Sequence, residues 1–394
     1  MSQADILRVG LIGCGNVVSY GHRPALTTLD DVQLVALADI TEARRKIGQD
    51  WFGLSTENLY EDYRAVLERQ DVDAVCVTVP QQYRRQIILD AIAAGKHILS
   101  EKPLAIAPAV AAELIAAAKD ADLTFGIVHN YHFLPEYRQI KQLLDSEVVG
   151  QLRVITMHYL GVIDYPGAAE YQSDWRHTVA AGGGVLMDMI HGVYLAEWLA
   201  GAPAKQVMAF VDAPTYAADR PVVEDLALVQ IAFPSSYATI HMGWGEGVGG
   251  VDISGSAGHL RMRYNEYQTS GFNQPAELYT VQGWQRTDHS LENLPTHVDN
   301  IGRSFTELWA DFHAAIQEKR PPLATADAGQ RALEIVLAAY ISDVTGRVVK
   351  LPLDRDHPVY QNGIAGMADV ESWNESKTQA AGLFGLRDHR RSVT

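Results

Sequence analysis

Short apolar runs alternate with longer stretches of helical periodicity over the first third of the chain. Five short runs are predicted as strands: residues 6–12, 33–38, 74–79, 97–100 and 124–128. The first is mostly apolar, as a parallel strand buried on both faces is. Helical stretches lie between them, at residues 23–29, 41–50, 83–94 and 108–121. Alternation at this spacing predicts an α/β domain with a parallel sheet and right-handed crossovers.

The pattern changes after about residue 150, where strand-like runs follow one another with few helices between them. These runs are residues 152–160, 206–211, 226–233, 238–243 and 259–264. Turn-forming segments rich in glycine, proline and serine separate them, which predicts a second, mainly antiparallel sheet in an α+β domain. Helical periodicity returns at residues 305–317 and 328–344, and the chain from about residue 354 is polar and irregular.

Composition narrows the class of protein. The 394 residues carry 32 Lys and Arg against 48 Asp and Glu, a formal charge of −16, which disfavours binding to nucleic-acid phosphates. No apolar run approaches the roughly 20 residues of a membrane span. The start of the sequence has no signal-peptide pattern, and the cysteines Cys14 and Cys76 are too few for a disulfide framework. We therefore expect a cytoplasmic globular protein without nucleic-acid or membrane partners.

A glycine-rich turn follows the first predicted strand. Gly13 would permit the tight turn, and Gly15 would let the backbone of Asn16 and Val17 approach a pyrophosphate at a helix N-terminus. Val18 stands where the usual fingerprint has a third glycine or alanine. Glycines also form ordinary turns, so the context of strand and helix carries this interpretation.

Asp39 ends the second predicted strand, 26 residues after Gly13. A carboxylate there accepts hydrogen bonds from an adenosine ribose and repels a 2′-phosphate, so NAD is expected rather than NADP. Two alternatives stay open. Asp39 could cap the next helix, and Arg44 or Arg45 could accommodate a 2′-phosphate.

The segment 94–104 carries Glu101-Lys102-Pro103 to the carboxyl end of the parallel sheet, where ligands of such folds bind. Taken alone it could be a solvated turn. Together with Gly-Cys-Gly-Asn at 13–16 and Gly-Gly-Gly-Val-Leu-Met-Asp at 182–188, it resembles the Gfo/Idh/MocA oxidoreductase family. The resemblance runs from about residue 7 to 351.

That resemblance implies a Rossmann domain over 1–129, a substrate-binding and oligomerisation domain with a large open sheet over 130–353, and an extension over 354–394. It implies a nicotinamide cofactor and a sugar or polyol substrate. Glu101 would contact the nicotinamide riboside, Lys102 would hydrogen-bond the substrate, and Pro80 would lie against the cofactor. The family often has a histidine where this chain has Arg84.

Asp188 and His191 follow the glycine run and are expected on one face of a helix that continues to about residue 199. A histidine oriented by a carboxylate suits proton removal from an alcohol. The family's usual spacing is one residue longer, so the shorter spacing rotates the histidine by about 100° around a helix axis. Half a metal site is an alternative, but the sequence offers no convincing partner ligands, and no metal is expected.

Other segments are candidates for the pocket. Asn130 is expected near the cofactor and Tyr131 and His132 near the substrate, unless they form an aromatic plug between domains. Trp175 and Arg176 lie in a segment whose aromatic and charged residues suit a sugar. The segment 20–22, with His22, would be a lid near the nicotinamide or a surface loop.

The sequence therefore predicts an NAD-dependent dehydrogenase of a sugar, inositol or sugar derivative. Lys102 would polarise the reacting oxygen, and His191 with Asp188 would take the proton. One alternative is a redox-neutral glycoside-processing enzyme that retains NAD, and another is a dinucleotide-sensing regulatory protein. The exposed face of the open sheet predicts self-association, and the resemblance implies a homodimer or homotetramer.

Overall fold

The computed structural model describes residues 6–162, 182–212, 223–244, 249–264, 276–280, 286–289 and 297–370. The chain forms two compact units that interleave along the sequence. The first comprises Met1–Ala105, Val110–Pro135 and Pro295–Gln330, and the second comprises Ile106–Ala109, Glu136–Leu294 and Arg331–Thr394. Each unit thus combines segments that are distant in the sequence, and the bounds of the units differ from the expected domain ranges 1–129 and 130–353.

The first unit is built on a six-stranded parallel sheet in the order β3-β2-β1-β4-β5-β6. Its strands are β1 (Leu7–Ile12), β2 (Val32–Ala38), β3 (Leu59–Tyr60), β4 (Ala74–Val77), β5 (His97–Ser100) and β6 (Phe125–Ile127). The helices are α1 (Arg23–Thr28), α2 (Glu42–Phe52), α3 (Arg64–Leu67), α4 (Gln81–Ala93) and α5 (Pro108–Asp120). This strand order is that of a Rossmann fold, so the predicted α/β class is confirmed.

Helix α9 (His297–Glu318) completes the first unit, although the sequence analysis assigned this region to the second domain. Its aromatic residues Phe305, Trp309 and Phe312 are buried. A Cβ on Gly21 would lie 2.6 Å from the Phe305 ring, so the glycine gives this ring room to pack. The local periodicity predicts the helix correctly but carries no information on which sheet it joins.

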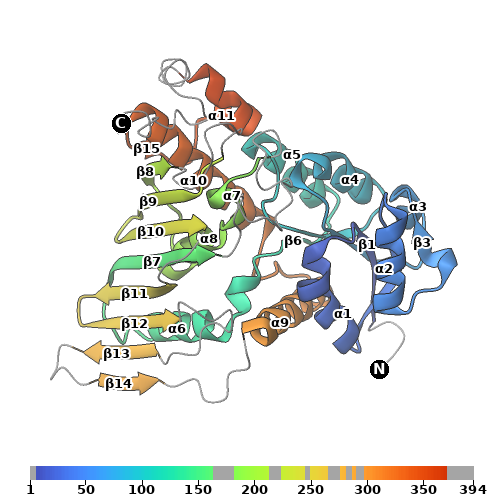
Figure 1. The fold of residues 1–394 in the computed structure, drawn as a ribbon, viewed down its shortest axis with the longest axis horizontal. Helices are drawn as coiled ribbons and strands as arrows, with labels where there is room; N and C mark the ends of the chain where they lie inside the picture. The colour runs from blue at the N-terminus through green and yellow to red at the C-terminus, as the bar shows by residue number, and fades with distance from the viewer. Residues whose placement is uncertain are drawn as a thin grey trace, which may run out of the picture. The chain divides into compact units, whose positions relative to one another are not determined.

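The second unit contains a nine-stranded mixed sheet in the order β14-β13-β12-β11-β7-β10-β9-β8-β15 (Figure 1). The strands are β7 (Leu152–Val162), β8 (Gln206–Asp212), β9 (Leu226–Ala232), β10 (Tyr237–Trp244), β11 (Gly249–Gly255), β12 (Gly258–Tyr264), β13 (Ala276–Thr280), β14 (Arg286–His289) and β15 (Val349–Lys350). Among the described strands, β7 and β10 pair in parallel and all other neighbours are antiparallel. The predicted mainly antiparallel sheet is confirmed.

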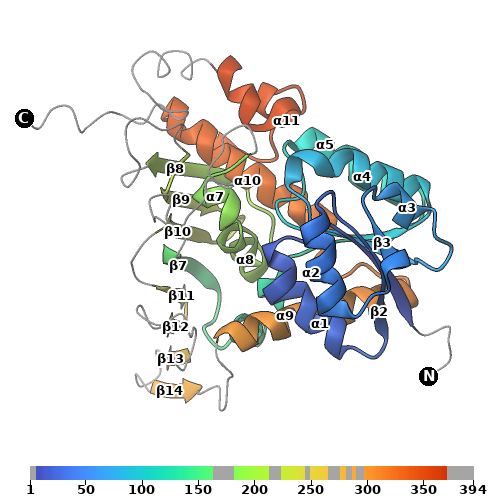
Figure 2. The ribbon, with the colours of Figure 1, turned by 45° about the vertical axis from the view of Figure 1, so that its right-hand side comes forward.

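Helices α8 (His191–Ala200) and α10 (Ala326–Thr345) cover one face of this sheet, which Figure 2 shows nearly edge-on. A Cβ on Gly192 would lie 2.7 Å from Met242 and 2.9 Å from Tyr159, so α8 packs closely on β10 and β7. Burial alternates along β9 and β10, as expected for a sheet with one covered face. The opposite face presents Phe210 at 64% exposure and Tyr237 at 62%.

The structure describes the segment that follows β15 as far as residue 370. It contains α11 (Pro358–Asn362) and a 3₁₀ helix, η7 (Gly363–Asp369). Val359 and Tyr360 of α11 and Met367 of η7 are buried. Gly363 has φ +60° and its Cα lies against the carbonyl of Ile106. The prediction of an irregular polar extension is therefore wrong for residues 358–369, and residues 371–394 lie outside the described part.

The structure also bears on membrane spans and metal sites. Among the helices that the structure describes, none combines the length and the apolar character that crossing a membrane requires. Within the described residues, no group of three or more His, Cys, Asp or Glu side chains is arranged to hold a metal ion.

Candidate active site

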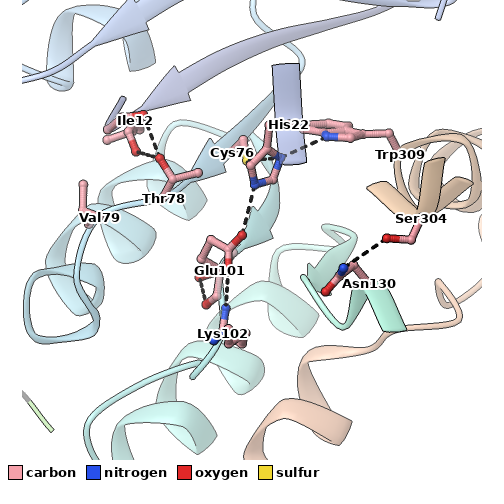
Figure 3. Close-up of polar contacts among 12 residues, drawn as sticks. Ile12, His22, Cys76, Thr78, Val79, Glu101, Lys102, Asn130, Ser304 and Trp309 are labelled. Carbon is pink, nitrogen blue, oxygen red and sulfur yellow. Dashed lines mark hydrogen bonds and ion pairs between the residues drawn. The ribbon is translucent and has the colours of Figure 1, made fainter. Parts of the chain in front are cut away.

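The turn between β1 and the first helix depends on Gly13. Its φ is +94°, and a Cβ at this position would lie 2.9 Å from the Thr78 hydroxyl, which donates a hydrogen bond to the Gly13 carbonyl (2.7 Å; Figure 3). Gly15 differs, because a Cβ there would meet no atom within 4 Å. The backbone at Gly15 is therefore open to a ligand, as a pyrophosphate-binding turn requires.

The first helical segment begins at Asn16, earlier than predicted, and passes through a π-helical turn, η2 (Val18–His22), before α1. Asn16 is exposed, Val17 is half-buried and Val18 is fully buried. Val18 thus occupies the position of the usual third glycine as a core residue.

Both carboxylate oxygens of Asp39 accept backbone hydrogen bonds. Oδ2 accepts from the N–H of Cys14 (2.8 Å), and Oδ1 accepts from the N–H of Thr41 (2.8 Å). Thr41 is the N-cap of α2, so the alternative in which Asp39 caps that helix is wrong. A carboxylate has about four acceptor positions, which leaves Asp39 able to accept ribose hydroxyls as well.

Two arginines of α2 contact the Asp39 backbone and the glycine turn. Arg45 Nη1 donates to the Asp39 carbonyl (2.7 Å), and Arg44 Nη2 lies 3.4 Å from Asn16 Oδ1. Cationic groups therefore lie on the glycine turn and beside Asp39.

Glu101 and Lys102 follow β5. Glu101 is buried, with Oε1 at 3.2 Å from His22 Nε2 and Oε2 accepting from the N–H of Lys102 (3.1 Å; Figure 3). Lys102 is half-buried, and its peptide bond to Pro103 is cis. The Glu-Lys-Pro segment is therefore an ordered turn whose carboxylate is held at both oxygens.

Asp188 and His191 lie on two helices rather than one. Asp188 ends α7 (Val185–Asp188), Met189 leaves the helical conformation at φ −93° and ψ 30°, and His191 begins α8. The prediction that they share one helix face is wrong because of this break, so rotation about a single axis does not apply. Both side chains are buried, and His191 Nδ1 lies 2.7 Å from the Tyr194 hydroxyl.

The start of α7 is held by Glu224, a residue that the sequence analysis did not single out. The Glu224 carbonyl accepts from the N–H of Val185 (3.0 Å), and its Oε1 accepts from the N–H of Leu186 (2.9 Å) and the hydroxyl of Tyr340 (2.7 Å). Burial raises the pKa of Glu224 to about 8. Its position between two apolar strands carries no sequence signal of this contact.

Comparison with known proteins agrees with both units. Residues 7–129 match the family model for the oxidoreductase family with an NAD-binding Rossmann fold, and residues 141–351 match that family's C-terminal alpha/beta domain. The chain belongs to the Gfo/Idh/MocA oxidoreductase family. The resemblance stated from its motifs is confirmed.

Relatives in this family are named for sugar chemistry. The dTDP-3,4-didehydro-2,6-dideoxy-alpha-D-glucose 3-reductase of Actinomadura kijaniata is 30% identical over 77% of this chain and 86% of its own length. The myo-inositol 2-dehydrogenase of Thermotoga maritima is 25% identical over 88% and 98%. The structure of a levoglucosan dehydrogenase with NADH has a TM-score of 0.76 at 21% identity, over 88% of this chain and all of that one, which shows a shared fold.

The NAD expected in a Gfo/Idh/MocA oxidoreductase fits the first unit. The open backbone at Gly15 suits a pyrophosphate, and the Asp39 carboxylate lies 2.8 Å from the backbone nitrogen of Cys14 in the same turn. Pro80 is half-buried and is the N-cap of α4, directly after the Thr78-Val79 segment that packs on Gly13.

Arg84 stands at the position where the family resemblance would lead one to expect a histidine. It is fully buried on α4 and donates to four carbonyls: Val79 (2.7 Å), Lys102 (3.3 Å), Glu101 and Pro103. Burial lowers the pKa of Arg84 to about 10, so the guanidinium stays charged at neutral pH. Arg84 thus binds the backbone carbonyls of all three residues of the Glu-Lys-Pro turn. Its position in the sequence alone does not predict this role.

The remaining candidates fall into three groups. Asn130 is buried in the 3₁₀ helix η4 (Asn130–Phe133) and donates to the Ser304 hydroxyl of α9 (3.0 Å); Tyr131 is half-buried and His132 buried beside it. Trp175 and Arg176 lie outside the described residues. His22 is fully buried, so both expectations for the segment 20–22, a lid or a surface loop, are wrong for this residue.

Proposed function

We propose that this oxidoreductase transfers a hydride from a secondary alcohol of a sugar, an inositol or a sugar derivative to NAD. The observation that carries the proposal is the buried Glu101-Lys102-Pro103 turn, which Arg84 holds by its carbonyls. In a solvated turn, water would satisfy these carbonyls and no buried arginine would be needed. The names of the relatives, a sugar-nucleotide reductase and an inositol dehydrogenase, support a polyhydroxylated substrate.

NAD, when bound, supplies the hydride acceptor. The Lys102 ammonium hydrogen-bonds the substrate oxygen and stabilises the negative charge that develops there as the carbon–hydrogen bond breaks. A lysine suits this task because it is a compact cation with three donors. Its backbone is held at both polar groups, because Arg84 donates to the Lys102 carbonyl and Glu101 Oε2 accepts from the Lys102 N–H.

His191 takes the hydroxyl proton in this proposal. The Tyr194 hydroxyl lies within hydrogen-bond distance of His191 Nδ1 and can donate to this nitrogen or accept from it. When Nδ1–H donates to the Tyr194 oxygen, Nε2 has a lone pair that can accept the proton of the alcohol. Asp188 supplies a negative charge that stabilises the imidazolium formed in this step.

The cofactor contacts follow from the first unit. Gly13, Gly15, Asn16 and Val17 bind the pyrophosphate, Asp39 binds the adenosine ribose, and Pro80, Glu101 and Asn130 lie along the nicotinamide half. We assign Tyr131, His132, Trp175 and Arg176 to the substrate, because aromatic faces and charged groups suit sugar rings and hydroxyls.

The experiment is NADH formation across a panel of sugars and inositols with the wild type and Lys102→Ala. We expect at least one polyol to give net NADH and the variant to lose about 100-fold or more in kcat. The exposed Lys119→Ala on α5 is the matched control and should retain wild-type turnover. Undiminished turnover by Lys102→Ala would reject its role, and turnover without net NADH would favour the redox-neutral, NAD-retaining alternative.

Self-association through the outer face of the nine-stranded sheet is a second part of the proposal. Phe210 lies directly across from Leu228, and Tyr237 from Val154, and all four side chains are exposed. These two cross-strand pairs form apolar rows on the uncovered face. A second copy of the chain, which presents the same rows, would bury them in a symmetric dimer.

A further inference from the structure

Three buried side chains from distant parts of the sequence form one hydrogen-bonded chain in the first unit. Trp309 Nε1 of α9 donates to His22 Nδ1 (3.1 Å), and His22 Nε2 lies 3.2 Å from Glu101 Oε1 (Figure 3). His22 and Trp309 are fully buried, and Glu101 is 5% exposed. No part of the mechanism above uses His22 or Trp309.

The chemistry of these groups permits one arrangement of protons. An indole N–H only donates, so His22 Nδ1 must present its lone pair and carry no proton. The neutral ring then carries its proton on Nε2, which donates to Glu101 Oε1. Glu101 accepts this bond as a carboxylate. Trp309 therefore fixes the tautomer of His22, and that tautomer fixes the acceptor role of Glu101.

The surroundings leave no competing arrangement among the described contacts of His22. The Cys76 sulfur lies 3.7 Å from Nδ1 and 3.9 Å from Nε2, farther than the indole nitrogen and the carboxylate oxygen, and burial raises the pKa of this thiol well above its usual range, so it stays uncharged. The Phe305 ring packs edge-on against the imidazole at 4.9 Å. The charged groups nearby are Glu101 and, beyond it, the guanidinium of Arg84 on the Glu101 carbonyl.

Both oxygens of the Glu101 carboxylate are consequently held, Oε1 by His22 and Oε2 by the N–H of Lys102. Two fixed donors define the plane of the carboxylate, and its remaining lone pairs can accept the hydroxyls of a bound nucleoside. His22 ends the π-helical turn that follows Gly15, so the same residue ties the carboxylate to the phosphate-binding turn.

We propose that Trp309 and His22 are positioning residues that hold the Glu101 carboxylate for the nicotinamide riboside. The inference rests on the proposed role of Glu101 in cofactor binding. In this proposal, α9, which follows strands β7 to β14 in sequence, contributes to the affinity for NAD.

The first test is calorimetric titration of NADH into the full-length protein and Trp309→Phe. The variant keeps an aromatic ring but removes the N–H, and we expect the Kd for NADH to rise about 5- to 30-fold. Phe312→Leu, a loss of packing on the same helix, should lower Tm without changing the Kd.

Variants of His22 provide the second test. His22→Gln retains an N–H that can donate to Glu101, so its Kd should lie within about threefold of the wild type. His22→Leu has no polar atom and should weaken NADH binding as much as Glu101→Gln does. Thermal unfolding of each variant separates loss of positioning from loss of the fold.

The outcomes distinguish the two proposals. If Trp309→Phe and His22→Leu bind NADH like the wild type while Glu101→Gln binds weakly, the positioning role is overturned and the role of Glu101 stands. If Glu101→Gln itself binds like the wild type, the cofactor role of Glu101 is overturned and the inference with it. A raised Kd in Trp309→Phe and His22→Leu, restored by His22→Gln and unchanged in Phe312→Leu, supports the proposal.

Discussion

The Cα of Gly184 lies directly against the carboxylate of Glu224, so that a Cβ on residue 184 would overlap Oε2. Gly184 has φ +122°, a conformation that other L-residues rarely adopt. The last glycine of the Gly-Gly-Gly run is thus required by a buried carboxylate as well as by its own backbone. This contact sets the start of the helix that ends at Asp188.

Gly184→Ala should lower the free energy of unfolding by about 3 kcal/mol or more, because both the backbone and the Glu224 side chain must move. Gly201→Ala is the control: it has φ +66° but open space around it, and should cost only about 1 kcal/mol. Urea unfolding followed by circular dichroism measures both. Equal losses would show that the carboxylate contact is immaterial.

Glu224 should make stability depend on pH. Its pKa is raised from 4.5 to about 8 by burial, so between these values the folded state holds a proton that the unfolded state releases. Its contribution is complete below pH 4.5 and is lost as the pH rises through 8, with a slope of up to about 1.4 kcal/mol per pH unit.

Glu224→Gln removes this titration but keeps an acceptor for Leu186 and Tyr340. The difference in unfolding free energy between wild type and variant should therefore change with pH from 5 to 8. The wild type should lose stability relative to the variant as the pH rises. Denaturant titrations at a series of pH values measure this difference, and a constant difference would contradict a protonated Glu224.

Arg84→Met should lower kcat by about 10- to 100-fold, because the carbonyls around Lys102 lose their donors and the turn relaxes. Arg85→Met is the matched control on the next residue of α4. Arg85 is exposed and pairs with Glu113 of α5, so its loss should leave kcat within about twofold. Steady-state kinetics on the best polyol compares them, and equal effects would exclude a special role for Arg84.

Asp39→Ser should weaken NAD binding about tenfold and improve NADP binding, because it removes the ribose acceptor and the negative charge while Arg44 and Arg45 remain. Asp50→Ser, at the exposed end of α2, should change neither affinity. Titrations with both cofactors give the ratio of Kd values. An unchanged ratio in Asp39→Ser would place the adenosine ribose elsewhere.

Phe210→Lys combined with Tyr237→Lys should convert the expected dimer or tetramer to a smaller species, because it places two charges in the apolar rows. Val348→Lys, at an exposed apolar residue elsewhere in the second unit, should not. Light scattering during gel filtration gives the mass. A wild type that is already monomeric, or an unaffected double variant, would reject this face as the interface.

The sequence predicts the two sheets well because burial imposes a local pattern on each strand. The glycine turn and the Glu-Lys-Pro turn can also be recognised in the sequence, because the functional residues of each turn are consecutive or nearly so. His22 and Trp309 are 287 residues apart, and no local pattern reports such a contact. The break after Asp188 was also missed, because buried apolar residues at 189 and 190 suit a continuous helix equally well.

The return of α9 to the first unit has a consequence for biosynthesis. A nascent chain that has emerged only to Pro135 contains all six strands of the parallel sheet, but not the segment Pro295–Gln330. Until that segment is translated, Gly21 and His22 expose the surface that Phe305 and Trp309 later cover. The first unit can therefore be completed only late in synthesis, after the ribosome has translated all strands of the second sheet except β15.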